Sequence, residues 1–156
     1  MTKTIEFTNV NPISSKDTSL IKNEIKKTIN NNDFILGESV KKFEDSFSKL
    51  SKIRYSVGCA SGTDALILAL KSLNLKKGDE VIVPGLTYIS TGLSVLLNNN
   101  NLIFSDVDNK TGLISIEKTV QKINKKTKAI IAVNLYGQKV DLKKLRLKIG
   151  KKNFYY

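Results

Sequence analysis

Apolar residues recur at helical spacing over the first fifty positions of the chain, in two sets separated by a polar run. The first set recurs every four residues: Ile21, Ile25 and Ile29. It predicts a helix that Ser15 or Asp17 can cap and that the polar residues 30–33 end. The second set follows Gly37 with spacings of three and four: Val40, Phe43, Phe47 and Leu50. It predicts a second amphipathic helix.

Beyond residue 52 the pattern changes to short apolar runs that alternate with helical segments. The runs rich in β-branched and apolar residues predict four strands: 53–59, 80–84, 102–107 and 128–134. The segments between and after them predict helices: 61–74, 87–97, 116–123 and 142–149. Strands that alternate with helices form parallel βαβ units, so the sequence predicts an α/β fold with a mostly parallel sheet.

Three details of this pattern give further expectations. The helix at 61–74 is apolar almost all round, which predicts deep burial. The continuous apolar strand at 128–134 is typical of a strand buried on both faces. Asp141 is expected to cap the last helix, and residues 151–156 begin to look like one more strand.

Composition limits the classes of protein that remain. The chain has 156 residues, of which 40% are hydrophobic and 26% charged, as in a folded domain of ordinary size. No apolar run is long enough to span a membrane, and the first residues lack a signal pattern, which predicts a soluble cytoplasmic protein. With Cys59 as the single cysteine and no histidine, a disulfide framework, a Cys/His zinc site and a His-based triad are excluded, and no metal is expected.

The net charge of +12 raises the possibility of a nucleic-acid partner. However, 24 of the 26 basic residues are lysines, and only Arg54 and Arg146 offer the guanidinium that reads base edges best. The lysines are also spread along predicted helix faces. A solvated surface explains them better than a nucleic-acid interface, so no nucleic-acid partner is expected.

One segment combines a predicted strand end, small residues and a helix start. At such a start Gly62 would let a ligand approach the backbone, and Thr63 would add a hydroxyl donor, so that unpaired N–H groups could hold a phosphate. The alternative is purely structural, with Ser61 capping the helix and Asp64 completing a capping box. Both can hold together.

Two further segments follow predicted strands and therefore belong to the same edge of a parallel sheet. Tyr88, beyond the strand that Pro84 closes, could cover a planar cofactor ring or could be a packing residue. After the strand at 128–134, Gly137 is expected to make the turn, while Asn134 and Gln138 are either polar contacts or ordinary loop residues.

Several motifs in a fixed order resemble those of a known family. SGTDAL, GDEVIVP, the Thr-Tyr pair after it, and LYGQ occur at the intervals seen in the amino-terminal half of DegT/DnrJ/EryC1/StrS sugar aminotransferases. The resemblance runs from about residue 34 to about residue 149. It implies that residues 1–33 are an amino-terminal helical segment and that residues 34–156 are the first part of the large domain of an aspartate-aminotransferase-type fold.

The resemblance also implies a chemistry. Family members use pyridoxal 5′-phosphate (PLP) to transfer an amino group, usually from glutamate, to a nucleotide-linked keto-sugar that enters polysaccharides or antibiotics. Gly62, Thr63 and Asp64 match the phosphate-binding positions, and Tyr88 matches the aromatic residue that stacks on the pyridine ring. Asn134 falls where many relatives carry histidine and is the candidate substrate contact. A homodimer is expected for the full-length family member.

In the family the Schiff-base lysine and the aspartate that binds the pyridine nitrogen come later, at positions expected beyond Tyr156. No catalytic residue is therefore assigned within these 156 residues. The alternative reading is a catalytically inert, truncated homologue that at most binds phosphate ligands. Related dehydratases share the same first half. The strand at 54–59 is expected to pair with a strand beyond Tyr156, so the isolated chain is expected to be poorly stable.

Overall fold

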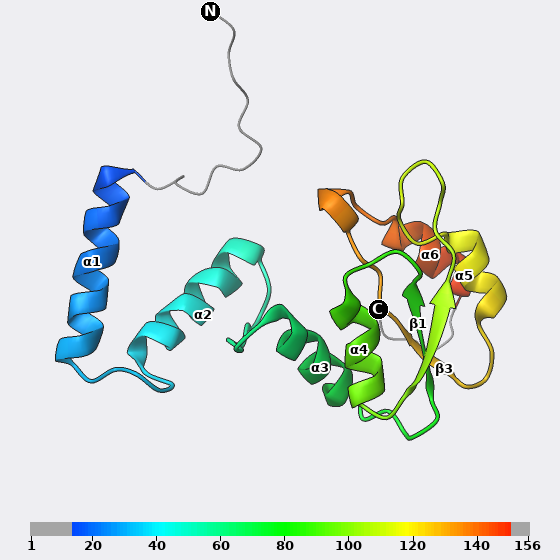
Figure 1. Ribbon diagram of the computed structural model, residues 1–156, viewed down its shortest axis with the longest axis horizontal. Helices are drawn as coiled ribbons and strands as arrows, with labels where there is room; N and C mark the ends of the chain where they lie inside the picture. Colours follow the sequence, from blue (N-terminus) through cyan, green and yellow to red (C-terminus); the bar gives the residue numbers. More distant parts are fainter. Residues whose placement is uncertain (1–13, 151–156) are drawn as a thin grey trace, which may run out of the picture. The chain divides into compact units, whose positions relative to one another are not determined.

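The computed structural model describes residues 14–150, which fall into two compact units, one within Met1–Gly58 and one within Cys59–Tyr156 (Figure 1). The strand expected at 151–156 lies outside the described residues. The division of domains after residue 33 stays a prediction.

The first unit contains the two predicted helices, α1 (Ser15–Asn30) and α2 (Glu38–Ser51). The cap of α1 is Ser14, whose Oγ accepts a hydrogen bond from the backbone N–H of Asp17 at 3.1 Å, so neither predicted cap was right. None of the described residues in this unit is buried, and the apolar positions of α1 are about half exposed. The apolar faces of both helices therefore lack a core within this unit.

The strand predicted at 53–59 is absent from the structure. Residues 56 and 58 are instead held to α2, because Ser56 Oγ donates to the Glu44 carbonyl at 2.6 Å and the Gly58 N–H donates to the Glu44 carboxylate at 2.7 Å. A strand exists only through backbone pairing with a neighbour, and none of the strands in the described part of the chain pairs with this segment. The prediction was wrong for that reason.

The second unit contains a three-stranded parallel sheet in the order β2-β1-β3. The strands are β1 (Glu80–Pro84), β2 (Asn101–Ser105) and β3 (Thr127–Ile130). The first matches its prediction, whereas the other two end earlier than predicted. Since β1 is the central strand, it is the most deeply buried, and β3 pairs on one side only within the described residues.

Helices pack on both faces of this sheet (Figure 1). They are α3 (Gly62–Ser72) and α4 (Ile89–Leu97) on one face, and α5 (Ile116–Lys122) and α6 (Leu142–Ile149) on the other. Val81 and Val83 of β1 pack with Leu70 and Val95 of the first pair, whereas Ile82 packs with the cluster of the second pair. This alternation along one strand divides the core into two layers.

Two helices differ from their predictions. Only Leu70 of α3 is buried, and Leu68 is 52% exposed, because within its own unit α3 packs along one side, against α4. The prediction of deep burial was therefore wrong. Helix α4 begins at Ile89 rather than Thr87, with Tyr88 as its N-cap residue.

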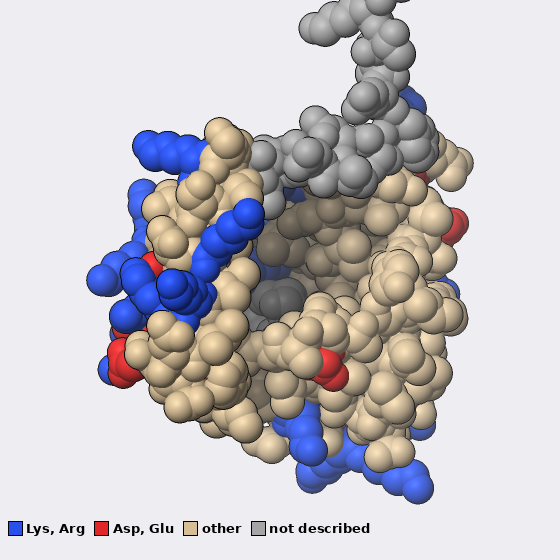
Figure 2. All heavy atoms as spheres, turned by 60° about the vertical axis from the view of Figure 1, so that its left-hand side comes forward, with Lys and Arg blue, Asp and Glu red and all other residues tan. Residues whose placement is uncertain are grey.

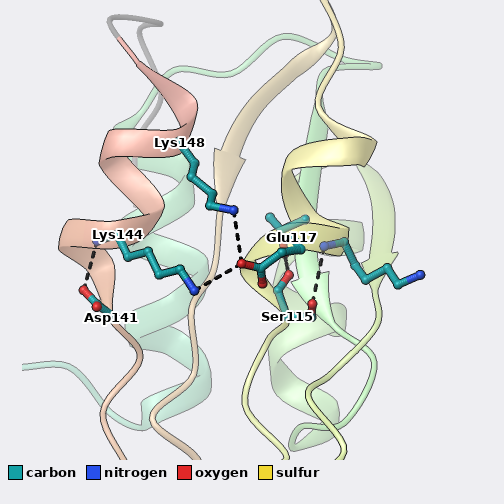
Figure 3. A network of polar contacts seen from close by, with 7 residues as sticks. Ser115, Glu117, Asp141, Lys144 and Lys148 are labelled. Carbon is teal, nitrogen blue, oxygen red and sulfur yellow. Dashed lines mark hydrogen bonds and ion pairs between the residues drawn. The ribbon is translucent and has the colours of Figure 1, made fainter.

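The helices α5 and α6 are joined by charged side chains (Figure 3). Glu117 Oε1 lies 3.1 Å from the Nζ atoms of both Lys144 and Lys148. Ser115 caps α5, and Asp141 caps α6 by accepting a hydrogen bond from the Lys144 N–H at 2.9 Å, which confirms the predicted cap. These groups tie the two helices on one face of the sheet together.

Acid is expected to weaken this link. The pKa of the Glu117 carboxyl is lowered to about 2, first by the hydrogen bond from its own backbone N–H and then by Lys144 and Lys148. The stabilisation of the fold by the ionised Glu117 carboxylate is thus fully present above the ordinary carboxyl pKa, about 4.3. It is lost as the pH falls toward 2. We expect the small difference in Tm between the native chain and a Glu117→Gln variant to shrink over that range. A difference that does not change with pH would contradict this assignment.

Lysine and arginine side chains far outnumber acidic ones on the face drawn in Figure 2. The lysine and arginine side chains of α6 are exposed, as the prediction of a solvated basic surface requires. Between residues 14 and 150, no helix is both long and apolar enough to cross a membrane.

Candidate functional site

The start of α3 is capped as the sequence predicts. Ser61 Oγ accepts a hydrogen bond from the Asp64 N–H at 3.1 Å and donates one to the Asp64 carboxylate at 2.8 Å. The Ser61 carbonyl accepts from the Ala65 N–H at 2.9 Å. Ser61 and Asp64 thus hold the first turn in place, a variant of the capping box in which the acid bonds the hydroxyl.

The same turn keeps donors available for an anion. The backbone N–H groups of Gly62 and Thr63 and the Thr63 hydroxyl make no hydrogen bond in the part of the chain that the structure describes. A Cβ built on Gly62 would meet no atom within 4 Å, so the backbone is open to a ligand at this point. The capped turn and the anion-binding turn are therefore compatible, and the residues fit a phosphate group.

Tyr88 stands at the start of α4 with its ring 74% exposed. It borders a cavity of about 380 Å³ whose other walls include Gly92, Leu96 and Phe104. Nearby, the hydroxyl groups of Thr87 and Thr91 lie 2.9 Å apart. That Tyr88 covers a cofactor ring stays a prediction.

The loops that follow the three strands meet at the carboxyl edge of the sheet. A Cβ on Gly112, in the loop after β2, would lie 3.5 Å from Leu86 Cδ2 and 3.9 Å from Leu135 Cδ2, which belong to the loops after β1 and β3. Gln138 Nε2 donates to the Thr111 carbonyl at 2.9 Å and joins two of these loops directly. Ligands of open α/β sheets bind at this edge.

Asn134 has a structural role in the loop after β3. Its Oδ1 accepts a hydrogen bond from the Val140 N–H at 2.9 Å, which closes the loop. Gly137 has φ +79 and makes the turn, as predicted. Tyr136, which sequence reasoning did not single out, also has a positive φ, of +53, and its side chain is 90% exposed. Its only sequence signal was its place before the glycine in LYGQ.

The candidate residues thus form three groups rather than one. Gly62, Thr63 and Asp64 share the first turn of α3, whereas Tyr88 begins α4 and Asn134 lies in the loop after β3. Helices α3 and α4 pack together, since Asn98 Nδ2 of the α4 C-cap donates to the Ile67 carbonyl at 3.2 Å. No hydrogen bond joins the three groups within residues 14–150. That Thr63 and Tyr88 face one crevice stays a prediction.

The sequence model of the DegT/DnrJ/EryC1/StrS aminotransferase family matches residues 15–153. The chain belongs to this family. The resemblance seen in the motifs is thereby confirmed over nearly the whole chain.

Several curated relatives have names that specify enzymes of nucleotide-linked sugars. The chain is 43% identical over 118 residues to a UDP-N-acetyl-3-dehydro-alpha-D-glucosamine 3-aminotransferase of Acidithiobacillus ferrooxidans, covering 76% of this chain and 32% of the relative. It is 41% identical over 109 residues to a GDP-perosamine synthase of Escherichia coli O157:H7, covering 70% and 30%. A GDP-4-keto-6-deoxy-D-mannose 3-dehydratase of Yersinia pseudotuberculosis is 39% identical over 125 residues, covering 76% and 32%. The chain thus spans about a third of the length of these relatives.

Solved structures of the DegT/DnrJ/EryC1/StrS family confirm the predicted fold class. The aminotransferase from Psychrobacter cryohalolentis superimposes with a TM-score of 0.85 at 29% identity, covering 96% of this chain and 38% of that one. The E. coli GDP-4-keto-6-deoxy-D-mannose-3-dehydratase with bound hydrated PLP gives 0.83 at 31% identity, covering 90% and 38%. Another solved relative, from Bacillus subtilis, holds the amine form of the cofactor, PMP. The last two of these solved relatives therefore hold PLP or PMP as cofactor.

Proposed function

We propose that this chain forms the cofactor-phosphate-binding part of a PLP-dependent enzyme that transfers an amino group from glutamate to a nucleotide-linked keto-sugar. The observation that carries the proposal is the first turn of α3. There Ser61 caps the helix, and an open glycine and unpaired donors follow it. A phosphate at this turn would meet backbone N–H groups and the positive end of the helix dipole.

Each candidate residue has a role that its surroundings support. The N–H groups of Gly62 and Thr63 and the Thr63 hydroxyl would bind the phosphate, while Asp64 keeps the turn in position through Ser61. The exposed ring of Tyr88 would cover the pyridine ring. Asn134 uses Oδ1 within its loop, which leaves its amide NH₂ as a donor toward substrate. When bound, PLP supplies the electron sink for the chemistry at the amino group.

A second candidate function is dehydration of the keto-sugar. The dehydratase of Yersinia pseudotuberculosis matches at 39% identity, close to the 43% of the aminotransferase of Acidithiobacillus ferrooxidans. The matched segment is thus shared by two reaction types, and the reaction must be tested directly.

The test uses protein expressed from the complete coding sequence that contains these residues, with PLP, glutamate and a panel of UDP-, GDP- and dTDP-linked keto-sugars. Formation of an amino sugar together with 2-oxoglutarate would support the proposal. Loss of water with formation of a deoxy sugar would support the second candidate. If the protein binds no PLP, or leaves every keto-sugar unchanged, the proposed function fails.

A further inference from the structure

Tyr136 combines two features that packing does not explain. Its backbone is left-handed, with φ 53 and ψ 30, a conformation that is costly for a non-glycine residue. Its side chain is 90% exposed, so little burial compensates this cost. An exposed aromatic side chain on a strained backbone is a feature from which a ligand-binding role can be inferred.

Hydrogen bonds around Tyr136 hold the strained conformation. The Gly137 N–H donates to the Asn134 carbonyl and the Gln138 N–H donates to the Leu135 carbonyl, both at 3.1 Å. The bonds from Asn134 to Val140 and from Gln138 to the neighbouring loop hold the two sides of the turn. The backbone at Tyr136 is therefore held in place by the hydrogen bonds of its loop.

Two exposed lysines lie in the two loops that the Gln138 bond joins. Lys139 lies in the same loop as Tyr136, and Lys110 lies in the turn whose Thr111 carbonyl accepts the bond from Gln138. Neither ammonium group takes part in an ion pair within the described residues. The acid of that turn, Asp108, uses Oδ1 for bonds to the backbone N–H groups of Lys110 and Thr111 and to the Thr111 hydroxyl. An exposed aromatic ring in loops that also carry exposed lysines suits a planar base that is linked to phosphates.

We propose that Tyr136 stacks on the base of the nucleotide-linked substrate, with Lys110 and Lys139 attracting its diphosphate. The proposal rests on the proposed function and adds a specific binding residue to it. Because every base has a π-face, stacking on one ring tolerates uracil, guanine or thymine. It therefore gives affinity for nucleotides without selecting one base.

The experiment measures the binding of UDP and of PLP, separately, to the native chain and to Tyr136→Asn and Tyr136→Phe variants. Asparagine tolerates the left-handed backbone, so Tyr136→Asn keeps or raises Tm. It removes the ring, however, and is expected to weaken UDP binding about tenfold. Tyr136→Phe keeps the ring and should bind UDP within about twofold of the native chain. All three proteins should bind PLP equally.

Leu147→Asn is the matched control, since it removes an apolar side chain that is 83% exposed from α6 in the same unit. It should leave UDP binding unchanged. The proposal is overturned if the native chain binds PLP but not UDP, if Tyr136→Asn binds UDP as the native chain does, or if Tyr136→Phe loses as much as Tyr136→Asn. Loss of PLP binding by the native chain would instead contradict the proposed function.

Discussion

Replacing Gly62 by leucine is expected to weaken PLP binding by at least tenfold while leaving the fold intact. The site at Gly62 is open, since a Cβ there would meet no atom within 4 Å, and leucine is a good helix former. The added side chain would occupy the space through which a phosphate reaches the N–H groups of α3. Each hydrogen bond to a charged group is worth roughly 1.5–3 kcal/mol, so the loss of even one corresponds to about tenfold or more.

The measurement is a PLP titration followed by absorbance and equilibrium dialysis, with Tm recorded for each variant. Ala69→Leu is the matched control, because it places the same leucine side chain at an exposed position of α3, two turns from the cap. It should bind PLP as the native chain does. Undiminished binding by Gly62→Leu would show that the phosphate does not approach this turn.

The largest loss of stability is expected from Ile82→Ala. Ile82 is fully buried in the central strand β1 and belongs to the core layer that α5 and α6 cover. Removing a buried isoleucine side chain costs about 2–5 kcal/mol, from a free energy of unfolding that is only about 5–15 kcal/mol for a whole domain. The variant should therefore unfold at a markedly lower urea concentration, or fail to fold.

Urea titrations followed by circular dichroism would measure this effect. Leu147→Ala serves as its control, because a side chain that is 83% exposed should change the free energy of unfolding by no more than about 0.5 kcal/mol. Equal midpoints for Ile82→Ala and Leu147→Ala would contradict the placement of the core.

Elements defined by local pattern were predicted well from the sequence. The strand at 80–84 and the cap at Asp141 agree with the structure. Both depend only on neighbouring residues: an apolar run that proline closes, and an aspartate directly before a helix. The strand at 53–59 and the burial of α3 depend on what packs beside them. Pairing and packing partners are set by the fold as a whole. Periodicity alone could therefore not reveal that the segment 53–59 and most of α3 lack such partners within the described residues.

The same limit applies to the candidate site. The cap formed by Ser61 and Asp64 lies within four residues, and the sequence predicted it. The bond from Gln138 to Thr111 joins residues 27 positions apart, and the positive φ of Tyr136 follows from the turn that this loop makes. Contacts between loops and strained backbone angles have no signature in residue type, so the role of Tyr136 emerged only from the structure.

The lack of buried residues among residues 14–58 has a consequence for synthesis of the chain. These residues leave the ribosome before residues 59–156, and their helices build no core from their own side chains. At about 5–20 residues per second, the ribosome needs about 5–20 s to add residues 59–156. Throughout that interval no residue of the first unit buries the isoleucine-rich face of α1, which leaves it open to chaperones and proteases. Slowing translation should therefore increase degradation of the nascent chain more than it would for a protein whose first helices close on each other.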